Sequence, residues 1–157
     1  MVAACTRLTG GVLHVKLSRM GKLSRGTEPD PWFITGLLQR DGSFTFSRSA
    51  GQLVMMFGVK MREDHDLLQD LLSFFNVGRI YGGIFFRVSN RHELGRVIEH
   101  FDEFPPRGSK LRSYEIWREM VLLREESFRR QPVDRLEELA AELRRVAPRR
   151  RSARRVE

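Results

Sequence analysis

The sequence has one cysteine, Cys5, in 157 residues. A single thiol excludes an intrachain disulfide framework and a zinc site built on cysteines. No apolar run approaches the roughly 20 residues that a membrane-spanning helix requires. His65, His92 and His100 lack the mutual spacing of metal ligands. The chain is therefore expected to fold without disulfides and to have neither a membrane partner nor a small-molecule substrate.

Positive charge is abundant by contrast. The chain has 28 Lys and Arg against 20 Asp and Glu, a net charge of +8, and most of the cations are arginine. The planar guanidinium group suits phosphate oxygens and guanine edges, so nucleic acid is the first candidate partner. An arginine-rich composition also follows from a GC-rich coding genome, and this alternative stays open.

Composition divides the chain into three parts. Residues 1–28 contain no acidic residue before Glu28 and predict a basic flexible arm or a targeting segment, or read-through from an upstream frame. Residues 29–130 contain most of the aromatic residues and predict a single folded domain. Residues 131–157 predict an amphipathic helix and a basic tail, which either touches phosphates or is unstructured.

Hydrophobic periodicity predicts the elements of the domain. Asp30 and Pro31 are typical of a helix start, and the helix is expected to run through Arg40. The spacing then predicts strands at 43–49 and 52–61, a helix at 63–75, strands at 79–81 and 84–89, and helices at about 90–101, 110–129 and 133–146. This order predicts an α+β fold, αββαββα, with a four-stranded antiparallel sheet and additional C-terminal helices.

The stretch from Phe33 to Phe44, FITGLLQRDGSF, resembles the signature of the LAGLIDADG homing endonucleases, with Ile34 to Gly42 aligned on the nine letters of that name. The segments FGVKMREDHDLLQDLLSFFNVGRI and GRVIEHFDEFPPRGSKLRSYEIW resemble the family's next strand and helix and its basic region. The resemblance covers about Asp30 to Phe128. It implies a nuclease that makes double-strand breaks at specific DNA sites. It also implies a location in an organelle, a mitochondrion or chloroplast, with the bacterial cytoplasm as the alternative.

The resemblance also implies the site. Asp41 would be catalytic and would bind Mg²⁺, with Mn²⁺ as a substitute, together with the backbone carbonyl of Arg40, and Lys110 would stabilise the transition state. The motif occurs once in the chain, so a homodimer is expected to bring two copies together. The interface would consist of Ile34, Thr35, Gly36, Leu37, Gln39 and Arg40.

One face of the predicted sheet is polar and basic, which favours a DNA-binding surface because a two-stranded ribbon fits the major groove. Arg79 and Arg87 are the candidates for reading guanine, whereas Arg48 is expected to contact phosphate. The full set of candidate DNA-binding residues is Ser43, Thr45, Ser47, Arg48, Ser49, Gln52, Met56, Lys60, Arg62, Arg79, Tyr81 and Arg87.

Three residues depart from the family pattern. Gln39 replaces the first acidic letter of the motif, at a position that varies. Met61 falls where a polar, water-organising residue is usual, so Lys60, Arg62 or Glu63 would substitute, or catalysis would be weak. Arg40 replaces a small residue and would either loosen the dimer or reach an acidic group across it. An inactive nucleic-acid binder of the same fold, such as an intron RNA maturase, is the alternative function. A general basic protein of RNA or membrane surfaces would explain the charge but not the motif.

Overall fold

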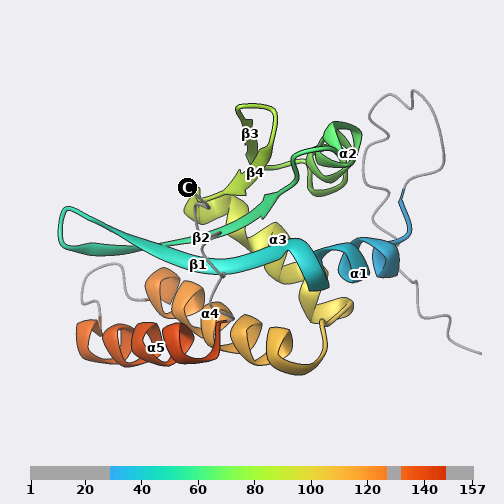
Figure 1. Cartoon of the computed structure of the whole chain (residues 1–157). Coiled ribbons are helices and arrows are strands. Elements are labelled where there is room, and N and C mark those ends of the chain that lie inside the picture. Colours follow the sequence, from blue (N-terminus) through green and yellow to red (C-terminus); the bar gives the residue numbers. More distant parts are fainter. Residues whose placement is uncertain (1–28, 127–131, 148–157) are drawn as a thin grey trace, which may run out of the picture.

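The computed structural model describes residues 29–126 and 132–147 (Figure 1). The predicted arm at 1–28, the end of the fourth predicted helix and the basic tail beyond 147 lie outside these residues. The αββαββα order and the additional C-terminal helix are confirmed. The elements are α1 (Pro31–Asp41), β1 (Gly42–Ser49), β2 (Gln52–Lys60), α2 (His65–Phe75), β3 (Arg79–Tyr81), β4 (Phe85–Val88), α3 (Arg91–Glu103), α4 (Gly108–Glu126) and α5 (Val133–Val146).

Local chemistry explains how α1 begins and ends. The Asp30 carboxylate accepts a hydrogen bond from the Phe33 amide at 3.1 Å, and Pro31 occupies the first turn, where its missing N–H costs nothing. Gly42 is both the C-cap of α1 and the first residue of β1. A Cβ atom at Gly42 would lie 2.5 Å from the Leu38 carbonyl oxygen, so only glycine allows this direct passage from helix to strand.

The four strands form one antiparallel sheet in the order β1-β2-β4-β3. β1 and β2 pair over their whole length, from Gly42 opposite Val59 to Ser49 opposite Gln52. β4 pairs only with residues 57–60 of β2. Residues 45–49 of β1 and 52–56 of β2 therefore extend beyond the other strands as a two-stranded ribbon, called here the distal ribbon (Figure 1).

The helices pack against one face of the sheet. Phe44 lies at the centre of this core. Its ring centroid lies 5.2 to 5.4 Å from those of Phe57, Phe101, Tyr114 and Trp117. The ring of Phe101 lies 5.9 Å from that of Phe57 and 5.4 Å from that of Tyr114. Figure 1 shows α4 and α5 beneath the β1–β2 hairpin. Alternate residues of β2, Leu53, Met55, Phe57 and Val59, are buried toward the helices. The period of two therefore leaves the intervening side chains on the opposite, open face.

Candidate functional site

Asp41 and Lys110 meet where α1 enters the sheet. Asp41 is the last residue of α1 and its side chain is partly exposed. The Lys110 ammonium group donates a hydrogen bond to the carbonyl oxygen of Gly42, the next residue. A carboxylate at a helix C-terminus stands at the negative end of the helix dipole, so it gains from a nearby cation. The two residues predicted to be catalytic are thus brought to one end of one helix, although they are far apart in sequence.

The chain between α3 and the first turn of α4 holds α1 in place. The Thr35 hydroxyl donates to the Phe104 carbonyl oxygen at 2.9 Å. The Gln39 side chain makes two hydrogen bonds with the backbone of Arg107, each of 2.9 Å. Together with the Lys110 contact, these bonds fix positions 35, 39 and 42, which lie on one side of α1. Asp41 is therefore carried by a helix whose inner side is tied down along most of its length.

His100 extends this anchorage into the core. Because the single proton of the Thr35 hydroxyl points to Phe104, the 3.0 Å contact between Thr35 Oγ1 and His100 Nε2 requires His100 to donate. The imidazole is only 8% exposed and contacts the rings of Phe74, Phe75, Phe101 and Phe104. Burial lowers the pKa of His100 to about 4, so the residue is neutral, as expected for a structural residue.

The predicted dimer interface requires correction. Ile34 and Thr35 are 1% and 5% exposed within this chain, so neither is accessible to a second copy. Gln39 is half-buried and is occupied by Arg107. The opposite side of α1 carries Trp32, Phe33, Gly36, Leu37 and Arg40, called here the outer stripe. Within this set Trp32 and Phe33 are 52% and 55% exposed, and no atom lies within 4 Å of a Cβ built on Gly36.

The sequence does not single out Trp32 and Phe33 as surface residues. A signal was available: apolar residues surround α1 on almost every side, and a helix that is apolar all round is usually covered on all sides. Two adjacent exposed aromatic side chains are also unusual on the surface of a monomer. The outer stripe is therefore a candidate contact surface.

The open face of the sheet carries most of the predicted DNA-binding residues. Ser47, Ser49, Lys60, Arg62, Arg79 and Tyr81 are exposed, whereas Ser43, Thr45, Met56 and Arg87 are half-buried. The guanidinium group of Arg87 lies 5.5 Å from the centroid of the Tyr81 ring, and its Nε atom is buried without a hydrogen-bond partner. Arg79 stands directly opposite Arg87 in the sheet. Two opposed cations are mutually repulsive, which makes this face attractive to an anion.

The two faces of the sheet differ in whether their cations are paired with carboxylates. On the helix side arginines bind carboxylates, as in Arg118 with Asp102 at 2.8 Å and Arg135 with Glu119 at 2.7 Å. Within the described part of the chain, no carboxylate pairs with Lys60, Arg79 or Arg87 on the open face. The net positive charge of the described sheet is therefore concentrated on the face that no helix covers.

Two predicted DNA contacts lie elsewhere. Arg48 points to the helix side, where its guanidinium group binds the Glu137 carboxylate through two hydrogen bonds of 2.7 and 2.5 Å. The pair raises the pKa of Arg48 and lowers that of Glu137. The Gln52 amide oxygen accepts a hydrogen bond from Arg124 of α4 at 3.0 Å. Arg48 therefore lies on the helix side and is paired with Glu137, and its contact with phosphate stays a prediction.

The metal-binding prediction requires a second chain. Among residues 29–126 and 132–147, no three His, Cys, Asp or Glu side chains are grouped so as to hold a metal ion. Asp41 offers one carboxylate, a hard oxygen ligand, and its only side-chain partner in the structure is the exposed Arg40 at 3.4 Å. Helix geometry leaves the Arg40 carbonyl without an intrahelical donor. These groups fit half of an oxygen-ligated site.

Met61 is buried, whereas the three residues predicted to take its place in ordering water are exposed. Met61 is buried in the core, and its amide donates to the Ile84 carbonyl at 2.9 Å. Lys60 ends β2 on the open face, and Arg62 and Glu63 follow in an exposed segment. Met61 itself therefore cannot order water at the surface, so both expectations stand: substitution by a neighbour, or weak catalysis.

A four-stranded antiparallel sheet with an open basic face, entered from a helix that ends in a carboxylate, is the architecture of a homing endonuclease. The family described as LAGLIDADG endonuclease matches residues 34–121, more than half of the sequence. The chain belongs to the LAGLIDADG endonuclease family.

Solved structures share the fold. I-AabMI bound to uncleaved DNA is 24% identical, with a TM-score of 0.66, over 72% of this chain and 44% of that chain. I-TnaI, a homing endonuclease, is 21% identical, with a TM-score of 0.64, over 76% of this chain and 97% of that chain. I-SmaMI bound to an uncleaved DNA target in the presence of calcium ions is 21% identical, with a TM-score of 0.64, over 74% of this chain and 45% of that chain.

One curated protein is also similar. It is an uncharacterized 50.9 kDa protein in ND4 intron 1 of Podospora anserina, 28% identical over 108 residues. The match covers 60% of this chain and 24% of that protein, so this chain spans about a quarter of the relative's length. In the described part of the chain, no helix has the length and apolar character to cross a membrane.

Proposed function

We propose that this protein is a divalent-metal-dependent endonuclease that cleaves double-stranded DNA at a specific site as a homodimer. The observation that carries the proposal is that Lys110 binds the carbonyl of Gly42, the residue directly after Asp41, at the start of β1. Phosphodiester hydrolysis needs a ligand for a metal ion and positive charge for the transition state. One carboxylate and one ammonium group at the same helix end meet both needs.

DNA would bind across the open face. Lys60, Arg79 and Arg87 supply cations that no carboxylate neutralises among the described residues. Ser43, Thr45 and Met56 supply hydroxyl and apolar groups for base edges and thymine methyl groups. The DNA-bound state of the neighbours I-AabMI and I-SmaMI supports DNA as the partner. A roughly palindromic target follows from two-fold symmetry.

The second copy would pack against the outer stripe of α1. Gly36 allows close approach of two helix backbones, and the exposed rings of Trp32 and Phe33 offer apolar area to bury. This chain covers 97% of I-TnaI but 44% of I-AabMI. A chain with one motif unit would cover nearly all of a one-unit protein and less than half of a two-unit protein, as these two values do. Each protomer would then contribute one Asp41 to a shared site.

Mg²⁺ is the metal that this site would take, held by the two Asp41 carboxylates and the Arg40 carbonyls, with Mn²⁺ able to replace it. A bound divalent ion stabilises the developing negative charge and lowers the pKa of bound water. The Asp41 carboxylate would hold the ion, and Lys110, which donates to the Gly42 carbonyl, would supply positive charge for the transition state. Tethering of α1 by Thr35 and Gln39 maintains this arrangement.

A noncatalytic nucleic-acid binder, such as an intron RNA maturase, is the second candidate. Burial of Met61 favours it, because the surface lacks a polar side chain at that position. The intron location of the similar Podospora protein is compatible with either function. The two candidates share the fold and the basic face and differ only in cleavage.

The decisive experiment incubates the full-length protein with a library of randomised DNA duplexes and with duplexes from intron insertion sites. With Mg²⁺ or Mn²⁺ we expect double-strand breaks at one site, and with EDTA we expect binding without cleavage. Binding without cleavage under every metal would overturn the nuclease in favour of the binder. Light scattering should report two protomers on one duplex, and a single protomer on DNA would refute the shared site.

Lys110→Met is expected to lower the cleavage rate of the purified protein about 10- to 100-fold, because one positioned positive charge is lost from the transition state. The measurement is single-turnover cleavage at saturating enzyme, so that weaker DNA binding does not enter. Arg79→Met, which removes a cation of the open face outside the predicted catalytic positions, serves as the control. We expect that control to weaken binding and to leave the saturated rate within about twofold, since its charge acts on DNA recognition and not on the reacting phosphate. Equal saturated rates for Lys110→Met and wild type would exclude the role of Lys110.

A further inference from the structure

The distal ribbon lacks the support that the rest of the sheet has. Its residues, 45–49 and 52–56, pair only with each other, because β4 ends its pairing at Phe57. A two-stranded hairpin is marginally stable in water unless another layer supports it. The ribbon is also a major part of the open face that would meet DNA. Contacts on its helix side must therefore fix its direction. Leu53 and Met55 are buried there, and Trp117 of α4 donates from its Nε1 to the Thr45 carbonyl oxygen at 3.2 Å.

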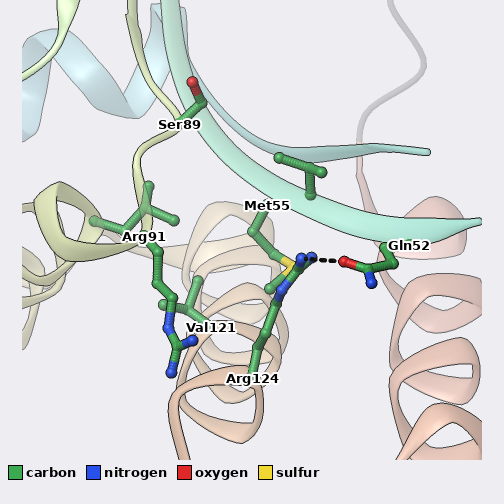
Figure 2. Close-up of a pocket in the computed structure, with 8 residues that line it drawn as sticks. Gln52, Met55, Ser89, Arg91, Val121 and Arg124 are labelled. Carbon is green, nitrogen blue, oxygen red and sulfur yellow. Dashed lines mark hydrogen bonds between the residues drawn. The ribbon is translucent and has the colours of Figure 1, made fainter. Parts of the chain in front are cut away.

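The core does not extend fully under the ribbon. A pocket of about 380 Å³ lies between the free edge of β2 and the two helices α3 and α4, lined on the strand side by Gln52, Val54 and Met55. Figure 2 shows Arg124 reaching from α4 toward the strand, where it donates to Gln52. Packing in this region is therefore incomplete along one edge of the ribbon.

The other edge of the ribbon is fixed by α5. Arg48 of β1 binds Glu137 of α5 through both carboxylate oxygens, a geometry that holds both side chains in one orientation. About two turns further along α5, the guanidinium group of Arg144 lies 4.9 Å from the centroid of the Phe46 ring. Phe46 and Arg48 point to the helix side, so neither contact competes with the residues on the open face.

α5 can serve as a fixed point because it is itself well packed. Leu136, Leu139, Ala140 and Leu143 are buried. Two ion pairs also join α5 to α4: Arg135 with Glu119 at 2.7 Å, and Glu142 with Arg112 at 2.5 Å. α5 is thus rigidly attached to the body of the domain on one side and to the ribbon on the other.

We propose that α5 positions the distal ribbon for reading DNA, through a clamp formed by Arg48, Phe46, Glu137 and Arg144. These are positioning residues that touch no base, and their consequence for DNA rests on the proposed function. With the clamp closed, the hydroxyl and apolar groups of the ribbon's open face stand in one arrangement before DNA arrives. Preorganisation of this kind lowers the ordering cost of binding and sharpens discrimination between sequences.

The first test needs no DNA. Backbone amide hydrogen exchange of the ribbon is measured in the full-length wild type, in Glu137→Gln and in the charge-swapped double variant Arg48→Glu, Glu137→Arg. We expect the ribbon amides to exchange about fivefold faster in Glu137→Gln, the effect of losing a well-formed exposed ion pair. The swapped pair should restore much of the protection, whereas general damage to the fold would not be repaired by it.

Glu119→Gln provides the matched control. It breaks an ion pair of the same kind, also made with α5, and its partner Arg135 has no contact with the ribbon in the structure. We expect wild-type exchange in the ribbon of this variant. Unchanged ribbon exchange in Glu137→Gln, or equal acceleration in both variants, would overturn the clamp whether or not the protein cleaves DNA.

The second test uses the target duplex found in the cleavage experiment. Base pairs are substituted one at a time, and the loss of binding is compared between variants. We expect Glu137→Gln to reduce discrimination about fivefold at the base pairs farthest from the cleavage site, and to leave the near positions unchanged. Arg48→Gln should act in the same direction although it changes the net charge with the opposite sign. Opposite effects of these two variants would show a charge effect and overturn the positioning role.

Discussion

Replacing Asp41 by Asn is expected to abolish DNA cleavage while leaving DNA binding nearly intact. The amide keeps the size of the side chain but removes the charged oxygen that a divalent ion requires. Metal-assisted charge stabilisation is worth several kcal/mol, and about 4 kcal/mol corresponds to about a thousandfold in rate. Single-turnover cleavage and an equilibrium binding assay in calcium, performed on the same duplex, measure the two effects separately.

Stability provides an internal check on this variant. Asp41 stands at the negative end of the α1 dipole, so its neutralisation should stabilise the helix by about 0.5 kcal/mol. A loss of activity accompanied by an equal or slightly higher melting temperature cannot come from unfolding. Asp30→Asn is the matched control at the other end of α1, because asparagine caps a helix as well as aspartate does. Rapid cleavage by Asp41→Asn would refute the assignment.

Acid should destabilise the protein before its carboxylates begin to titrate, because of His100. The folded-state pKa of this residue is about 4, below the ordinary value of 6.5. Above pH 6.5 the imidazole is neutral in both states and the stability is complete. As the pH falls from 6.5 toward 4, the unfolded chain takes up a proton that the folded chain does not, so stability is lost. The expected loss between pH 7 and pH 4.5 is about 2.5 kcal/mol.

Urea unfolding at several pH values measures this loss, and His100→Leu isolates its source. Leucine keeps an apolar side chain in the pocket, and the Thr35 hydroxyl still has the Phe104 carbonyl as an acceptor. The variant should therefore show a much flatter dependence between pH 6.5 and 4.5. His92→Gln, at an exposed histidine of the same helix, should retain the wild-type slope. A wild-type slope in His100→Leu would assign the acid sensitivity to other groups.

The sequence predicted the elements well because their signals are local. Alternation of Phe44 and Phe46 with serine and threonine defines β1, and Asp30 with Pro31 defines the start of α1. Antiparallel neighbours in a hairpin follow from the turns alone, since Ala50 and Gly51 both have positive φ, as the tight hairpin turn requires. The family resemblance then supported the prediction that these strands form one sheet.

The errors arise where a contact joins distant parts of the chain. The sequence gives α1 apolar residues on both sides, so it could not decide that Ile34 faces inward while Trp32 and Phe33 face outward. Arg48 was assigned to phosphate by its charge, although its phase in the strand matches the buried Phe44 and the half-buried Phe46. Its partner Glu137 lies 89 residues further along the chain, and no periodicity connects the two. The contact between Lys110 and Gly42 likewise depends on how the turn after α3 folds.

The two sides of α1 differ in what they contact. Thr35 and Gln39, with the adjoining Gly42, hold the helix to its own domain. Phe33, Gly36 and Arg40 are exposed, whereas Trp32 and Leu37 of the outer stripe also pack against the domain, Trp32 with its ring centroid 5.3 Å from that of Phe104. In the proposed dimer, choice of subunit partner through Phe33, Gly36 and Arg40 and alignment of Asp41 would therefore be separable properties of one short helix. An engineer could rewrite the outer stripe to force unlike subunits together, and so address asymmetric sequences, without retuning the residues that hold the carboxylate.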